Sequence, residues 1–376
     1  MLSWVHFGDL HVTHEDNFES AETLRALVDI LNLHVADTVD FAYLPGDNAN
    51  NGTGEQYGYI IDALNALRAR WHAIPGDHDF EPGSLDNFHA ALSQEGLPKA
   101  VMVNGHRCLF LDVVSEGKGG PDFKLGDTQT RWLEQQLAES ATDELRPTVF
   151  MHAYPGDLSE GGEPLARAFA DAGVLMVDTG HTHYNELLND GIVIYAATRS
   201  TGQIEEDEGR AGFSIATVDG NVVSWRFQRL DDTWPLVVIT SPADRRLVTD
   251  PHDSRQVPID VCVVRAKVFG KDVVDVVASV GATRVAMQPV DGETALWEAS
   301  LPIPADVDTY RLEVHATSTD GQNGTDAIEV LTRDGASARA SSVDTVLGTD
   351  AHAVGAWPER GLLGTQLGPN KYGHGW

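Results

Sequence analysis

The stretch Ile74-Pro75-Gly76-Asp77-His78-Asp79 decides the fold, because it ends an apolar run with two carboxylates on either side of a histidine. A buried carboxylate must be paired or bound to a metal, so three adjacent titratable side chains at the end of a strand favour chemistry over core packing. Taken alone, this stretch could also be a solvated turn. That alternative loses weight because the same design occurs elsewhere in the chain.

The design recurs at two earlier positions. Residues 3–7 form a β-type run that leads into Gly8-Asp9-Leu10-His11, and residues 39–44 form another that leads into Pro45-Gly46-Asp47-Asn48. Three short strand-like runs therefore each end in Gly-Asp.

Two later runs end in histidines. Residues 147–151 end at His152, and residues 174–178 lead into Thr179-Gly180-His181-Thr182-His183. Five strand ends thus present Asp or His, which is the pattern of a site at the carboxyl edge of an open α/β sheet.

Helical spacing of apolar residues separates the first three runs, over residues 20–35, with Ser20 as N-cap, and over residues 55–70. Asp9 and Asp47 are 38 residues apart, which suits a strand–helix–strand unit of about 30 residues or more, so these strands are expected to be parallel. Asn104-Gly105 predicts a hairpin and hence antiparallel strands. Three further helices are expected at residues 85–92, 126–138 and 163–172.

The ordered motifs Asp-x-His, Gly-Asp, Gly-Asp-His-Asp, a lone His and Gly-His-Thr-His resemble the calcineurin-like metallophosphoesterase superfamily over roughly residues 1–230. The resemblance implies an α/β fold in which two sheets are covered by helices, an αββα sandwich. One departure stands out. The third motif of the family normally reads Gly-Asn-His-Asp or Gly-Asn-His-Glu, and here Asp77 occupies the position of the asparagine.

The resemblance also implies a dinuclear metal centre in which a hydroxide that bridges the two ions is the nucleophile. Mixed imidazole and carboxylate ligands suit two ions of Mn, Fe, Zn or Co rather than Ca or Mg. Two such ions lower the pKa of a bridging water and clamp the oxygens of an in-line phosphoryl displacement. The implied ligands are Asp9, His11 and His183 for the first ion, Asp77, His152 and His181 for the second, and Asp47 bridging both.

Two further residues of the central stretch receive catalytic roles from the resemblance. His78 is the non-ligand histidine that neutralises phosphoryl charge or protonates the leaving oxygen, and Asp79 orients its ring. We also expect Arg199 to reach the phosphate and His14 to lie near the site. Three asparagines are expected to line the pocket, namely Asn48, Asn50 and Asn51.

Two motifs that mark other subfamilies are absent from this chain, which limits the subfamilies that it can resemble. Purple acid phosphatases carry a tyrosine three residues after the bridging aspartate, where this chain has Asn50, and the Asp-Arg-Gly of phosphoprotein phosphatases is missing. The remaining pattern looks most like the bacterial cyclic-nucleotide and glycerophosphodiester phosphodiesterases. We therefore predict hydrolysis of a small organic phosphodiester. The alternatives are a phosphomonoesterase of the same superfamily and a non-catalytic metal-binding scaffold or assembly protein.

The periodicity changes after the first domain, which we assign to residues 1–232. Short β-rich runs between turn residues fill residues 233–334 and predict an immunoglobulin-like sandwich without the disulfide of true immunoglobulin domains. Residues 335–376 read as a Gly-rich tail, either disordered or an arm packed on its own subunit or on a neighbour. A homo-oligomer formed through this domain or tail is an open alternative to a monomer.

The charge and the cysteine content limit which classes of partner and which cell compartment are expected. The net charge of −31 comes from 57 acidic against 26 basic residues, which argues against binding a nucleic-acid polymer. No apolar run reaches about 18 residues, so no membrane span is expected. Because the first predicted strand follows Met1 at once and the two cysteines, Cys108 and Cys262, fall in different predicted domains, we expect a cytoplasmic protein without a disulfide.

Overall fold

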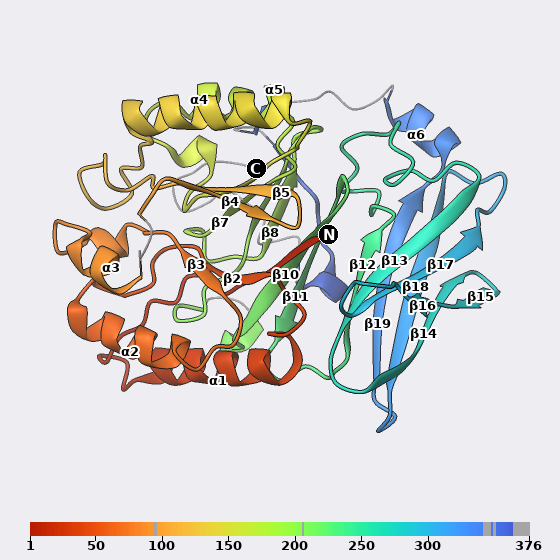
Figure 1. Cartoon of the computed structure of the whole chain (residues 1–376), viewed down its shortest axis with the longest axis horizontal. Helices are drawn as coiled ribbons and strands as arrows, with labels where there is room; N and C mark the ends of the chain where they lie inside the picture. Colours follow the sequence, from red (N-terminus) through yellow and green to blue (C-terminus); the bar gives the residue numbers. More distant parts are fainter. Residues whose placement is uncertain (93–95, 205–206, 341–346, 349–350, 364–376) are drawn as a thin grey trace.

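The computed structural model describes residues 1–92, 96–204, 207–340, 347–348 and 351–363. They form a helix-covered pair of sheets followed by an all-β region that lies against one end of that pair (Figure 1).

The first sheet has five strands and carries the first three motifs. Its inner strands β1, β2 and β3 are parallel, as the spacing of the motifs predicts, and β10 pairs antiparallel with both β1 and β11. In order across the sheet the strands are β11 (Val222–Arg229), β10 (Gly212–Asp219), β1 (Leu2–His6), β2 (Phe41–Leu44) and β3 (Trp71–Ala73).

The second sheet has seven strands and carries the two histidine motifs. Strands β5, β6, β7 and β9 run parallel, and β4 joins β5 through the predicted Asn104-Gly105 hairpin. In order the strands are β20 (His352–Ala353), β8 (Glu186–Asn189), β9 (Ile194–Ala197), β7 (Met176–Thr179), β6 (Thr148–Phe150), β5 (His106–Phe110) and β4 (Lys99–Val103).

Helices cover the outer face of each sheet (Figure 1). α1 (Glu19–His34) and α2 (Gly54–Leu64) pack on the first sheet, and α4 (Gly126–Thr142) and α5 (Gly162–Asp171) pack on the second. The short α3 (Asp86–Ala91) follows the central stretch. This arrangement confirms the predicted αββα sandwich.

Aromatic rings fill the space between the two sheets. Trp4 and Phe41 of the first sheet meet Phe110 and Phe150 of the second, with ring centroids 5.3 to 6.1 Å apart across the two sheets. All four side chains are buried, so this layer fixes the distance between the sheets and thereby between the strand ends that carry the motifs.

Two helix boundaries differ from the prediction. α2 ends at Leu64 rather than near residue 70, because β3 begins at Trp71 and the chain needs the intervening residues to turn back to the sheet. Ser20 lies inside α1 and does not cap it. Its hydroxyl accepts a hydrogen bond from the backbone N–H of Thr13 (3.0 Å), and Phe18 stands at the helix start with a left-handed backbone.

The all-β region consists of two four-stranded antiparallel sheets, in agreement with the predicted sandwich; the boundary after residue 232 stays a prediction. One sheet contains β12 (Leu236–Ser241), β13 (Val261–Phe269), β17 (Leu296–Pro302) and β16 (Gln288–Pro289). The other contains β15 (Thr283–Ala286), β14 (Val273–Val280), β18 (Thr309–Ser318) and β19 (Asn323–Leu331).

The described part of the predicted tail packs on its own chain. α6 (Arg333–Ala340) follows β19, and further on β20 pairs with β8. The guanidinium groups of Arg246 and Arg360 both lie over the ring of Trp357, 3.6 and 4.4 Å from its centroid. The prediction for residues 364–376 falls outside the described residues.

Both cysteines are buried and free, Cys108 in β5 and Cys262 in β13. Within the part of the chain that the structure describes, no helix combines the length and the apolar character needed to cross a membrane.

Arg360 joins the tail to both β regions, and we predict that its loss destabilises the protein. Its buried guanidinium donates to Asp326 Oδ2 of β19 (2.9 Å) and to the Trp225 carbonyl of β11 (3.0 Å). Without Arg360, the buried Asp326 keeps only one cationic partner, Arg226 at 2.9 Å, so Arg360→Ala should lower the free energy of unfolding by up to about 3 kcal/mol. Urea denaturation measures the change. The control is Arg167→Ala, whose exposed pair with Glu163 is worth about 0–1 kcal/mol; equal effects of the two substitutions would contradict the prediction.

Candidate metal centre

The structure brings all seven predicted ligands together where the two sheets meet. Asp9 and His11 follow β1, Asp47 follows β2, and Asp77 follows β3. The remaining three, His152, His181 and His183, follow β6 and β7 of the second sheet. The site thus lies at the carboxyl ends of parallel strands from both sheets, as the motif positions predict.

The ligand-type atoms form two groups that share Asp47, and within each group they lie within 4.8 Å of one another. The first group is Asp9, His11, Asp47 and His183, and the second is Asp47, Asp77, His152 and His181. The grouping is the one that the family resemblance implies. The metal-binding role of each residue stays a prediction.

Asp47 faces both groups with different oxygens. Its Oδ2 lies 3.6 Å from Nε2 of His11, and its Oδ1 lies 3.6 Å from Nε2 of His152. Oδ1 also accepts a hydrogen bond from the backbone N–H of His78 (2.9 Å), whereas the buried Oδ2 accepts none from the described residues. A carboxylate arranged in this way can bind one cation through each oxygen.

The imidazoles are oriented by their surroundings. Nδ1 of His152 donates to the Pro45 carbonyl (2.8 Å), which directs Nε2 toward Asp77 Oδ1 at 3.3 Å. Nε2 of His11 and Nε2 of His183 face each other at 3.0 Å. Two ring nitrogens at this distance, each beside a carboxylate, converge on a point that a cation could occupy.

The backbone around the site is strained in order to bring these side chains together. His11, Asp47, His181 and His183 all have left-handed φ values, between 44° and 69°. Such conformations are uncommon outside glycine and cluster at functional sites. Close approach of the loops also requires Gly76, because a Cβ there would lie 2.2 Å from Asp47 Oδ1.

The pKa shifts of the side chains in the site indicate that its buried carboxylates need compensating positive charge. Burial, together with the nearby carboxylates of Asp77 and Asp9, raises the pKa of Asp47 to about 8 against the lowering effect of His152. Burial lowers the pKa of His152, but Asp47 and Asp77 outweigh it and raise the value to about 10. For His11, burial and the adjacent His183 lower the pKa well below its ordinary value.

These features fit two transition-metal cations. Three buried carboxylates need compensating charge, a buried oxygen of Asp47 has no donor among the described residues, and imidazole with carboxylate is a donor set suited to Mn, Fe, Zn or Co.

His78 lies at the rim of this cluster, and its side chain is 29% exposed. The ring packs edge-to-face on that of His11, with centroids 4.6 Å apart. This placement, next to the ligand groups but outside both, agrees with the predicted non-ligand position.

The prediction that Asp79 orients the His78 ring is wrong. The buried carboxylate of Asp79 points into the protein and accepts hydrogen bonds from five donors on the surrounding loops and on α2. Nδ1 of His78 instead meets the Asn50 carbonyl at 2.7 Å and the Glu81 carboxylate at 3.2 Å. The donors to Asp79 are Gly76 N, Asn48 N, Asn48 Nδ2, Ala49 N and the Tyr57 hydroxyl.

Arg199 does not fulfil its predicted contact with phosphate. Its side chain is 3% exposed, pairs with Asp207 at 3.2 Å and lies over the ring of Phe227. It therefore belongs to the packing beneath the site. Sequence analysis missed Glu81, whose only signal is its position three residues after His78.

Of the three predicted asparagines, one is buried and stabilises a loop, and the other two lie at the rim of the site. Asn48 is buried and its amide donates to Ile74 O and Asp79, so it holds the loop together. Asn50 and Asn51 are half-buried and bonded to each other (3.1 Å) beside His78. The exposed His14 belongs to neither ligand group.

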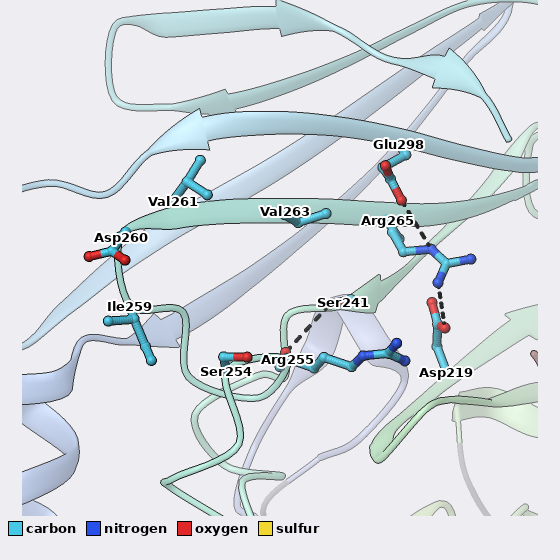
Figure 2. A pocket seen from close by; sticks show the side chains of 10 residues that line it. All are labelled: Asp219, Ser241, Ser254, Arg255, Ile259, Asp260, Val261, Val263, Arg265 and Glu298. Carbon is cyan, nitrogen blue, oxygen red and sulfur yellow. Dashed lines mark hydrogen bonds and ion pairs between the residues drawn. The ribbon is translucent and has the colours of Figure 1, made fainter.

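A hollow of about 450 Å³ lies elsewhere, between the β10–β11 hairpin and the outer face of β13 (Figure 2). Arg265 in its wall is paired with Asp219 at 2.9 Å and with Glu298 at 3.6 Å. No predicted ligand lines this hollow, so it is separate from the candidate metal centre.

Comparison with known proteins finds a family model and several relatives that match part of this chain. Residues 3–185 match the family model described as Calcineurin-like phosphoesterase. The chain is 27% identical over 135 residues to 3',5'-cyclic adenosine monophosphate phosphodiesterase CpdA of Escherichia coli (strain K12), which covers 36% of this chain and 46% of that protein. It is 29% identical over 167 residues to glycerophosphodiester phosphodiesterase GpdQ of Enterobacter lignolyticus (strain SCF1), covering 40% and 56%. The matches thus span about half the length of these relatives.

Among solved structures, purple acid phosphatase PPD1 from yellow lupin aligns with a TM-score of 0.46 and 14% identity, over 62% of this chain and 52% of that one.

The shared position of Asp47 predicts unequal effects of substitutions on metal content. The purified protein should carry close to two transition-metal ions per chain. Asp47→Ala removes a ligand from both groups and should lower the content toward zero, whereas His152→Ala affects one group and should leave about one ion. Elemental analysis after gel filtration measures the content, with His14→Ala as the control. Equal losses in the Asp47 and His152 variants would contradict a bridging role.

Proposed function

We propose that this protein, whose residues 3–185 match the family model of calcineurin-like phosphoesterases, is a dinuclear metal-dependent phosphodiesterase that hydrolyses a small organic phosphodiester. The observation that carries the proposal is the pair of ligand groups that share the buried Asp47. The names of both curated relatives describe phosphodiesterases of small substrates, a cyclic nucleotide and a glycerophosphodiester, which supports a substrate of this class.

The residues of the two groups would hold one cation each. When bound, such a pair of cations supplies an activated water as nucleophile and stabilises the charge on the phosphoryl oxygens. The protein's part is to keep seven ligands in place through buried loops. We assign the first cation to Asp9, His11 and His183, the second to Asp77, His152 and His181, and both to Asp47.

His78 would act on the substrate from the rim. Its backbone N–H donates to Asp47, and its ring packs against the ring of His11. The His78 side chain would therefore lie next to a phosphoryl group bound at the first cation. A positioned histidine can neutralise phosphoryl charge or donate a proton to the leaving oxygen.

Asp77 would favour diesters over monoesters. An asparagine at this position would bind metal through a neutral oxygen and offer its NH₂ to the substrate, whereas aspartate adds a charge and removes that donor. At about 5 Å and an effective dielectric near 20, one unit charge repels another by roughly 3 kcal/mol, an upper figure because the cations offset part of it. A monoester dianion feels about twice the repulsion of a diester monoanion.

We also propose that the protein works in a reducing compartment, the cytoplasm. The support is that Cys108 and Cys262 are both buried thiols without a disulfide.

A panel of chromogenic monoesters and diesters, assayed with added Mn, tests the proposed reaction. We expect diester turnover that a chelator abolishes. His78→Ala should keep its metal and lose about 10² to 10⁴ in kcat, the usual range for a general acid or base. No turnover by a fully metal-loaded protein would favour the scaffold alternative, and turnover of monoesters alone would favour a phosphomonoesterase. Loss of metal in His78→Ala would show that the histidine is a ligand.

Asp77→Asn should raise monoester turnover relative to diester turnover and weaken metal retention, because it removes one negative charge from the second group. The measurement is kcat/KM for a matched aryl monoester and diester with both proteins, together with metal content after dialysis. An unchanged or reversed ratio would mean that Asp77 has no influence on substrate choice.

A further inference from the structure

The ring of His78 is held by two acceptors at the same nitrogen. Nδ1 lies 2.7 Å from the Asn50 carbonyl oxygen and 3.2 Å from Oε1 of Glu81. A carbonyl oxygen can only accept, so Nδ1 carries a hydrogen whether the ring is neutral or protonated. Nε2 is then the ring nitrogen that remains for the substrate.

Glu81 reaches His78 because of the local helix type. The two residues are the first residue and the C-cap of a 3-10 turn, His78–Phe80, in which side chains three positions apart lie one above the other. An α-helix would place them at a wider angle. The carboxylate therefore lies beside the ring as a direct result of the turn.

Glu81 is itself fixed, although its side chain is 42% exposed. Its Oε2 accepts a hydrogen bond from Asn51 Nδ2 (2.8 Å). Oδ1 of Asn51 in turn accepts from Gln56 Nε2 (3.0 Å), and Gln56 is a buried residue of the capping box that begins α2. Hydrogen bonds thus link the start of α2 to the Glu81 carboxylate, which in turn pairs with the His78 ring.

We propose that Glu81 is the positioning residue of His78 and takes the place that sequence analysis gave to Asp79. This inference rests on the proposed function, since it assigns Glu81 a part in phosphoester hydrolysis through His78. The role is orientation. The carboxylate and the Asn50 carbonyl hold the Nδ1–H edge of the ring away from the metal centre, which directs the opposite edge toward the substrate.

A double-mutant cycle tests this assignment. Glu81→Ala should lower kcat up to about fivefold, the effect expected from losing a partly exposed ion pair, with little change in KM or metal content. Glu81→Gln keeps an acceptor oxygen within reach and should retain an intermediate kcat. Added to His78→Ala, Glu81→Ala should cause no further loss, because the two residues act as one unit. Glu163→Ala on α5, which also removes an exposed, ion-paired glutamate, should leave kcat unchanged.

The cycle distinguishes failure of this inference from failure of the proposed function. An active wild type whose kcat falls equally on Glu81→Ala in the presence and absence of His78 would overturn the positioning role alone. A readout independent of turnover is the ¹⁵N spectrum of histidine-labelled protein, in which the His78 signals are identified by their loss in His78→Ala. Glu81→Ala should shift the Nδ1 signal of His78, and Glu163→Ala should not. An unshifted signal would overturn the inference even if the wild type hydrolysed no phosphoester.

Discussion

The structure depends on one buried carboxylate, that of Asp47, which faces two sets of ligand-type side chains at once. Its two oxygens lie 3.6 Å from imidazoles that the two different sheets supply, His11 and His152. A carboxylate in this position is unfavourable without compensating positive charge. The left-handed backbone at Asp47 and the glycine at position 76 both serve to bring the loops close around it.

A buried polar contact keeps the two sheets in the register that this arrangement needs. Asp178 at the end of β7 accepts a hydrogen bond from Trp4 Nε1 (2.6 Å) and lies 2.8 Å from Nδ1 of His6, both on β1. His6 lies three residues before Asp9 in the sequence, and Asp178 lies three residues before His181. Because all three side chains are fully buried, a shift of one sheet relative to the other would leave polar groups unpaired. The same contact explains why a histidine, His6, is found in the core.

The sequence predicted the strands and the ligand positions because both follow from local patterns. The parallel strands β1, β2 and β3 and the Asn104-Gly105 hairpin are found as predicted, and Gly-Asp or His at a strand end is visible without knowledge of the fold. The errors concern contacts between distant segments. Arg199 turned out to pair with Asp207 inside the protein, and the partners of Asp79 come from a loop and a helix about 20 to 30 residues away. No periodicity encodes such contacts, so they required the structure.

The central stretch shows how one short turn can serve three purposes. Successive side chains in a 3-10 turn diverge by about 120°, so neighbours point in different directions. Asp77 reaches the second ligand group, His78 stays at the rim, and Asp79 points inward to anchor the loop that carries Asp47. The carboxylate of Asp79, next to His78 in sequence, is therefore directed away from the ring. The carboxylate of Glu81, one full turn after His78, is the one that can contact the ring. The geometry of the turn, rather than adjacency in the motif, selects Glu81 over Asp79 as the partner of the histidine.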